Sequence, residues 1–129
     1  MIDKTTDAAV KTFKEKSLQL KRCNLEYLHR MSSGDESFVK EMIKLFLKQV
    51  PQELEKLSTA ASDGQAVKQI AHKLKSSVSM VGAEDLLVQV KELEQKAING
   101  IDPISVVSYQ QELSQKFTDI KEELDTLLS

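Results

Sequence analysis

His72 is the residue in this sequence with the clearest capacity for chemistry. A solvated imidazole is largely neutral near pH 7, so a ring nitrogen can act as a nucleophile. Lys75 and Ser76 follow three and four residues later, which on a helix places both side chains one turn from the imidazole. An ammonium can balance the charge of a phosphoryl group, and a small residue leaves room for another protein. This pattern suits a phosphoryl carrier, with His72 as acceptor and Lys75 as the charge-stabilising cation.

The segment around His72 has the apolar period of a helix over residues 65–81. Its buried stripe is predicted to be Val67, Ile70, Ala71, Leu74, Val78 and Val81, with His72 beside the stripe and exposed to solvent. The polar residues of the same face are candidates for contact with a partner protein: Lys68, Gln69, Lys73, Ser76 and Ser79.

No residues in this segment form a magnesium site or a glycine-rich phosphate loop. The nearest acids in sequence are Asp63 and Glu84, which we expect near helix ends, far from His72. We therefore predict no metal site and no cofactor in this chain, and no catalytic or ATP-binding machinery of its own. The groups that stabilise the transfer reaction would come from the partner.

The elements that position His72 are predicted to be helices throughout. The chain has only four Gly and two Pro, and apolar residues recur at intervals of three and four. A short helix is expected over 24–31, followed by long ones over about 35–61, 65–81, 84–98 and 103–127. Asp35 and Asp102-Pro103 mark two helix starts, Gly82 and Asn99-Gly100 mark ends, and Pro51 should kink its helix. Short connections make successive helices antiparallel.

The predicted fold is therefore an all-α, up-down-up-down four-helix bundle with an additional short N-terminal helix. The bundle domain would span 24–129. Residues 1–23, with Val10, Phe13 and Leu18 as scattered apolar positions, are predicted to be a tail or an extra helix.

Composition restricts the class of protein. The net charge of −2 over 129 residues argues against a general nucleic-acid binder. The absence of a long apolar run argues against membrane insertion. The single Cys23 and the lack of a visible secretory signal favour a reducing, cytoplasmic environment. We expect the chain to be a monomer.

The stretch Ala71-His72-Lys73-Leu74-Lys75-Ser76-Ser77, followed by Gly82-Ala83, resembles the histidine phosphotransfer (HPt) domain of multistep two-component signalling. That family has His-x-x-Lys, a small residue after the Lys, and a Gly-Ala-like turn. The upstream pattern is also similar, with Leu25, Leu28, Gly34-Asp35, Phe38, Phe46 and Pro51. The resemblance covers residues 24–99. It departs at Ser76, where the family usually has Gly.

The resemblance implies that His72 takes a phosphoryl group from the aspartyl phosphate of a receiver domain and passes it to another receiver. The partners would be response-regulator receiver domains and a hybrid sensor histidine kinase, with magnesium on the receiver. Bundle geometry puts the level opposite His72 near residue 54 of the preceding helix. The residues near that level that we expect to be exposed are Gln49, Gln52, Glu53 and Lys56. Of these, we assign Gln49 and Gln52 to the docking face.

Two other classes of function remain open on sequence alone. The chain could be an adaptor bundle that binds a receiver or kinase and never carries phosphate. It could also be a small hydrolase or transferase that uses His72 as a general base, which would require a pocket and an orienting carboxylate.

Overall fold

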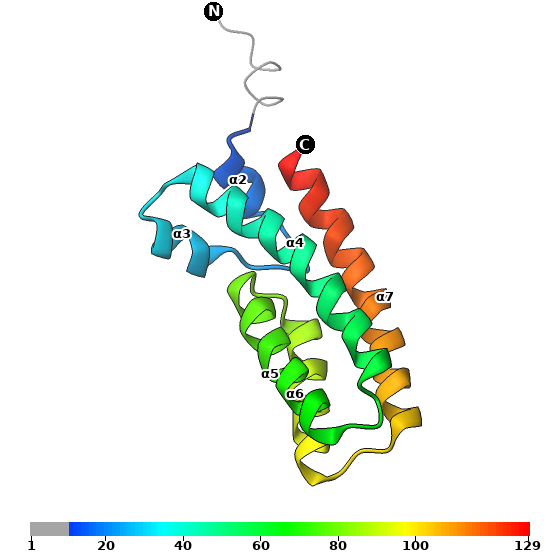
Figure 1. The fold of residues 1–129 in the computed structure, drawn as a ribbon. Coiled ribbons are helices and arrows are strands. Elements are labelled where there is room, and N and C mark those ends of the chain that lie inside the picture. The colour runs from blue at the N-terminus through cyan, green and yellow to red at the C-terminus, as the bar shows by residue number, and fades with distance from the viewer. Residues whose placement is uncertain (1–10) are drawn as a thin grey trace, which may run out of the picture.

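The computed structural model describes residues 11–129, and the elements of that part of the chain are all helices (Figure 1). They are α2 (Phe13–Ser17), α3 (Glu26–Ser32), α4 (Glu36–Thr59), α5 (Gly64–Met80), α6 (Glu84–Asn99) and α7 (Pro103–Leu128). The predicted all-α class is confirmed. Two short helices, rather than one, precede the long ones, because α2 forms within the segment left open as a tail or extra helix.

The four long helices form the bundle. α5 packs against α6, α4 packs against both α5 and α7, and α6 closes the ring against α7. Short turns connect them, so neighbours run in opposite directions (Figure 1). Of the two short helices, α3 packs on α4 and α2 packs on α7. His72 thus lies on α5, the second of the four long helices, which packs between α4 and α6.

Aspartate side chains begin three of the long helices. Asp35 accepts a hydrogen bond from the Phe38 N–H, and Asp102 accepts one from the Ser105 N–H, as the sequence predicts for both positions. Asp63, expected near a helix end, is the N-cap of α5 and accepts hydrogen bonds from the backbone N–H groups of Gln65 and Ala66. A carboxylate at this position satisfies N–H groups that have no partner within the helix.

The core is built from the apolar faces that the periodicity identifies. The apolar residues that recur at helical spacing along α7 are buried: Val106, Tyr109, Leu113, Phe117, Ile120, Leu124 and Leu127. α4 continues through Pro51 without a break in the helix. Met31 is 52% exposed whereas Leu28 of the same helix is fully buried, because the short helix α3 packs on α4 with one face only.

Gly82 ends α5 with a positive φ of 61°, which fits the prediction of a left-handed terminator. The structure adds a second requirement at this position. A Cβ on Gly82 would lie 2.4 Å from the carbonyl oxygen of Asn24, and the Asn24 N–H donates to the Val81 carbonyl at 2.9 Å. The segment before α3 therefore crosses directly over this turn, and only glycine leaves room for it.

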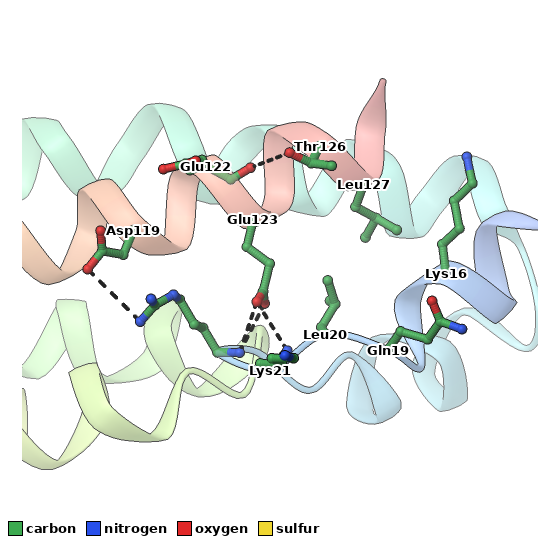
Figure 2. A pocket seen from close by; sticks show the side chains of 10 residues that line it. Lys16, Gln19, Leu20, Lys21, Asp119, Glu122, Glu123, Thr126 and Leu127 are labelled. Atoms are coloured by element: carbon green, nitrogen blue, oxygen red, sulfur yellow. Dashed lines mark hydrogen bonds and ion pairs between the residues drawn. The ribbon is translucent and has the colours of Figure 1, made fainter.

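Glu123 attaches the N-terminal segment to α7 (Figure 2). Its carboxylate accepts hydrogen bonds from the backbone N–H groups of Lys21, Arg22 and Cys23 at 3.1–3.2 Å. These contacts lie in an open hollow of about 490 Å³ between α7 and the segment after α2. They hold in place the chain that leads into α3.

The apolar positions expected in the first 23 residues differ in their surroundings. Phe13 is buried, whereas Leu18 is 73% exposed, and Val10 lies outside the described residues. The Nε2 atom of His29 is 2.8 Å from the Ser17 hydroxyl, which itself donates to the Lys14 carbonyl. Burial lowers the pKa of His29, and nearby Lys14 adds to the effect. This histidine therefore links α3 to α2 in a structural role.

Candidate functional site

His72 projects from the outer face of α5. Its side chain is 68% exposed, while Val67, Ala71, Leu74 and Val78 on the opposite face of the helix are buried. Val81 of the predicted stripe is buried as well, whereas Ile70, predicted to be buried, is only half-buried. The imidazole is accessible to a second protein without any change in the packing of the core.

A carboxylate from the neighbouring helix holds the imidazole. The His72 Nδ1 atom is 2.9 Å from Oε2 of Glu94 on α6. A carboxylate only accepts hydrogen bonds, so Nδ1 carries the hydrogen and donates it. In the neutral ring this leaves a lone pair on Nε2. The expectation that no acid lies near His72 was wrong, because it considered neighbours in sequence and not the helix packed alongside.

Lys75 shares the same carboxylate. Its Nζ atom donates to Oε1 of Glu94 at 2.8 Å, so Glu94 uses one oxygen for each of the two residues. The Glu94 side chain is only 15% exposed. The hydrogen bond from Lys75, followed by that from His72, lowers its pKa against the effect of burial, so the group is ionised near neutral pH. Lys75, predicted to be the charge-stabilising cation, is therefore tethered to Glu94 beside the imidazole of His72.

A second carboxylate lies on the other flank of α5. Glu53 on α4 accepts from Lys73 at 2.9 Å and from Lys56 at 3.1 Å. Burial alone would raise the pKa of Glu53, but the hydrogen bonds from the two lysines outweigh it and lower the pKa. Glu53 was expected to be exposed and is 6% exposed. The ion pair with Lys73 shows that residue 53 of α4 lies opposite residue 73 of α5.

The remaining predicted contact residues are distributed around the imidazole. On α5, Gln69 and Ser76 are exposed and Lys68 is half-buried. The Ser79 hydroxyl donates to the Lys75 carbonyl at 2.8 Å, so it already has a partner. On α4, Gln49 is half-buried and Gln52 is exposed.

A hollow of about 600 Å³ adjoins this face beyond Ser76. Its walls are Tyr27 and Met31 of α3, Lys75, Ser76, Ser79 and Met80 of α5, and Lys91 of α6. Tyr27 and Met31 are about half exposed, so they offer apolar surface beside a set of polar and cationic groups. Neither residue is predicted from the sequence, because their helix is short and its outward face has no periodic signal.

The position of Glu94 opposite His72 follows from the short turn between their two helices. The helices that carry His72 and Glu94 are joined by the tight turn at Gly82, with His72 ten residues before the turn and Glu94 twelve residues after it. Two antiparallel helices with a short turn bring such positions to nearly the same level. The same geometry predicted the level of residue 54 opposite His72, one residue from Glu53, which pairs with Lys73. Applied to the helix after Gly82, it would also have located residue 94.

Within residues 11–129, no group of three or more His, Cys, Asp or Glu side chains could hold a metal ion. No helix in that part of the chain is long and apolar enough to cross a membrane.

Comparison with known proteins gives two matches. A family model described as the Hpt domain matches residues 41–129, which include His72, Lys75 and Glu94. The X-ray structure of a rice protein assigned as a histidine-containing phosphotransfer protein has the same fold, with a TM-score of 0.68 and 19% identity over 96% of this chain and 82% of that chain. No curated protein sequence is significantly similar.

Proposed function

Because this chain belongs to the Hpt-domain family, we propose that it relays phosphoryl groups between receiver-domain aspartates of a two-component phosphorelay and that His72 is the phosphoacceptor. One observation carries the assignment to this residue. His72 is the exposed histidine, and its Nδ1 is engaged by Glu94, which leaves Nε2 directed to a partner. The chain's other histidine, His29, is held against Ser17 and has no comparable access.

The proposed transfer forms one bond and breaks one bond. The lone pair on Nε2 attacks the phosphorus of an aspartyl phosphate on the receiver. The bond between phosphorus and the aspartate oxygen breaks, and the carboxylate leaves with the electron pair. The ring keeps its Nδ1 proton and becomes positively charged, and the Glu94 carboxylate faces that charge. The reverse sequence delivers the phosphoryl group to a second receiver.

Lys75 is proposed to stabilise the charge on the transferred phosphoryl group. It starts from an ion pair with Glu94, so it must loosen that contact to reach a phosphoryl oxygen on Nε2. The hydrogen bond from His72 to Glu94 survives this exchange, because it uses the other carboxylate oxygen. Lys75 would therefore respond to the presence of phosphate, whereas Glu94 would orient the ring throughout.

The receiver is proposed to cover the face of α5 that carries His72. The contact residues would be Gln69, Ser76 and Ser79 of α5, Lys68 and Lys73 at its flanks, and Gln49 and Gln52 of α4. The adjoining hollow with Tyr27 and Met31 supplies apolar area at one edge of this face. The receiver would contribute the magnesium and the acidic pocket, and a hybrid sensor histidine kinase would be the upstream partner. We further propose that the chain works as a cytoplasmic monomer without a cofactor or catalysis of its own.

Transfer from a phosphorylated receiver tests the proposal. Wild-type protein, His72→Gln and His29→Gln are mixed with phosphorylated receiver and magnesium, and each is weighed by intact-mass spectrometry at neutral pH. We expect one added phosphoryl group on wild type and on His29→Gln, lost on brief acid treatment, and none on His72→Gln. Ser76→Leu should block transfer by obstructing the approach to His72. Binding of receivers to wild type without any added mass would favour the adaptor alternative instead.

A further inference from the structure

The three lysines closest to His72 on α5 differ in whether they are already paired. Lys73 donates to Glu53 on α4, and Lys75 donates to Glu94 on α6. Within residues 11–129, His72, Lys73 and Lys75 each have an acidic partner. Lys68 makes no ion pair in that part of the chain. Lys73 and Lys75, the two lysines nearest to His72 in sequence, are therefore both paired with a glutamate in the absence of phosphate.

Lys68 lies on the same flank of α5 as Lys75. The two are seven residues apart, which on a helix is two turns along one row, and the contact of Lys75 with Glu94 fixes that row as the one beside α6. His72 stands between them, four residues after Lys68 and three before Lys75. Lys73, by contrast, lies on the flank beside α4.

The usual direction of helical side chains favours an approach of the imidazole toward Lys68. Each Cα–Cβ bond in a helix tilts toward the N-terminus, so a long side chain covers the turn before its own Cα. From this general direction we expect the ring of His72 to lie toward the turn that contains Lys68. The four-carbon stem of a half-buried lysine can lie along the helix while its ammonium reaches solvent beside the ring.

We infer that Lys68 is the cation that pairs first with a phosphoryl group on Nε2 of His72. Its ammonium can move to a phosphoryl oxygen without losing an existing ion pair, whereas Lys75 must give up part of its contact with Glu94. The bond changes are those of the transfer given above, and Lys68 adds only an ion pair to the product. This inference rests on the proposed function, because it requires phosphate on His72.

The acidity of the phosphoryl group measures the pairing directly. Wild type, Lys68→Gln, Lys68→Arg and Lys73→Gln are loaded with phosphoramidate, and the ³¹P chemical shift of the phosphohistidine is titrated between about pH 5.5 and 9. A neighbouring cation favours the dianion. We expect Lys68→Gln to raise the pKa of the phosphoryl group by roughly 0.2 to 0.7, as for an exposed ion pair, and Lys68→Arg to restore it. Lys73→Gln removes the same charge from the other flank and should leave the pKa near that of wild type.

The possible results separate this inference from the function it rests on. If Lys68→Gln and Lys73→Gln titrate alike, or if neither differs from wild type, Lys68 is not the pairing cation, although His72 still carries phosphate. If wild type acquires no phosphohistidine signal at all, the proposed function fails before Lys68 is tested. Circular dichroism of the four proteins must show equal helix content, since a partly unfolded α5 would change the titration for an unrelated reason.

Discussion

The two flanks of α5 carry similar contacts with different consequences. On each side a mostly buried glutamate from a neighbouring helix binds a lysine of α5, Glu94 to Lys75 and Glu53 to Lys73. The other carboxylate oxygen of Glu94 accepts a hydrogen bond from His72. Glu53 instead accepts a second hydrogen bond from Lys56 on its own helix. The same pair of residue types thus holds the proposed acceptor, His72, on one flank, whereas on the other flank it only joins two helices. A mostly buried ion pair close to His72 is therefore not by itself evidence of a functional role.

Alanine at the two glutamates should separate orientation from helix attachment. We expect Glu94→Ala to slow phosphorylation of His72 by phosphoramidate about tenfold, the effect of losing one charge-assisted hydrogen bond, because the ring loses the contact that fixes its tautomer. Glu53→Ala should leave this rate within about twofold of wild type, because Glu53 has no contact with the ring. The rates are followed by intact mass. Equal losses in both variants would mean that the distinction between the two flanks is wrong.

The free energy of unfolding should respond differently to substitutions at Glu53 and at His72. We expect Glu53→Gln to lower the free energy of unfolding by about 1 kcal/mol, because it weakens a contact that joins α4 to α5. The far more exposed His72 should contribute little, so His72→Gln should unfold within about 0.5 kcal/mol of wild type. Urea titrations followed by circular dichroism measure both values. A large destabilisation in His72→Gln would contradict the exposed position of the ring.

The lysines offer a finer test of the comparison. Lys75→Ala should slow transfer from a phosphorylated receiver about two- to fivefold, as expected for one exposed cation near the phosphoryl group. Lys73→Ala should have a smaller effect on the same rate, because Lys73 points to the Glu53 flank. Stopped samples resolved on a phosphate-affinity gel give both rates. A greater effect from Lys73→Ala than from Lys75→Ala would reverse the assignment of the flanks.

The contribution of Glu53 should depend on pH in a defined direction. Its pKa is lowered from the ordinary value of 4.5 in the folded protein, so it stabilises the fold above that pH, and the stabilisation is lost as the pH falls through the folded pKa. The difference in unfolding free energy between wild type and Glu53→Gln should therefore be constant from about pH 8 to 5 and decrease below about pH 4.5. A difference that grows on acidification would show that the carboxylate is not held ionised by its lysines.

Much of this architecture follows from the sequence because it depends on local signals. Apolar residues at helical spacing predict the buried side of α7 and the outward position of His72, and Asp35 and Asp102 predict two helix starts. The His-x-x-Lys pattern with Gly82 identifies the family that the Hpt-domain match then shows. Each of these depends on residues close together in the chain.

The parts that sequence reasoning missed depend on contacts between helices. Glu94 lies 22 residues after His72 and has no local mark that separates it from other surface glutamates of α6. The burial of Glu53 depends on a lysine from another helix. Gly82 has a close neighbour in Asn24, which the chain places far away in sequence. Tyr27 and Met31 belong to a helix too short for its faces to be distinguished by periodicity.

The central claim is that Nε2 of His72 accepts phosphate while Glu94 holds Nδ1. The most direct test is ¹⁵N NMR of protein labelled at its two histidines and loaded with phosphoramidate. We predict that one ring nitrogen of His72 acquires coupling to phosphorus, that this nitrogen is Nε2, and that Nδ1 stays protonated. The signals of His29 should not change. Phosphate on His29, phosphate on Nδ1 of His72, or no coupling on either ring would contradict the account.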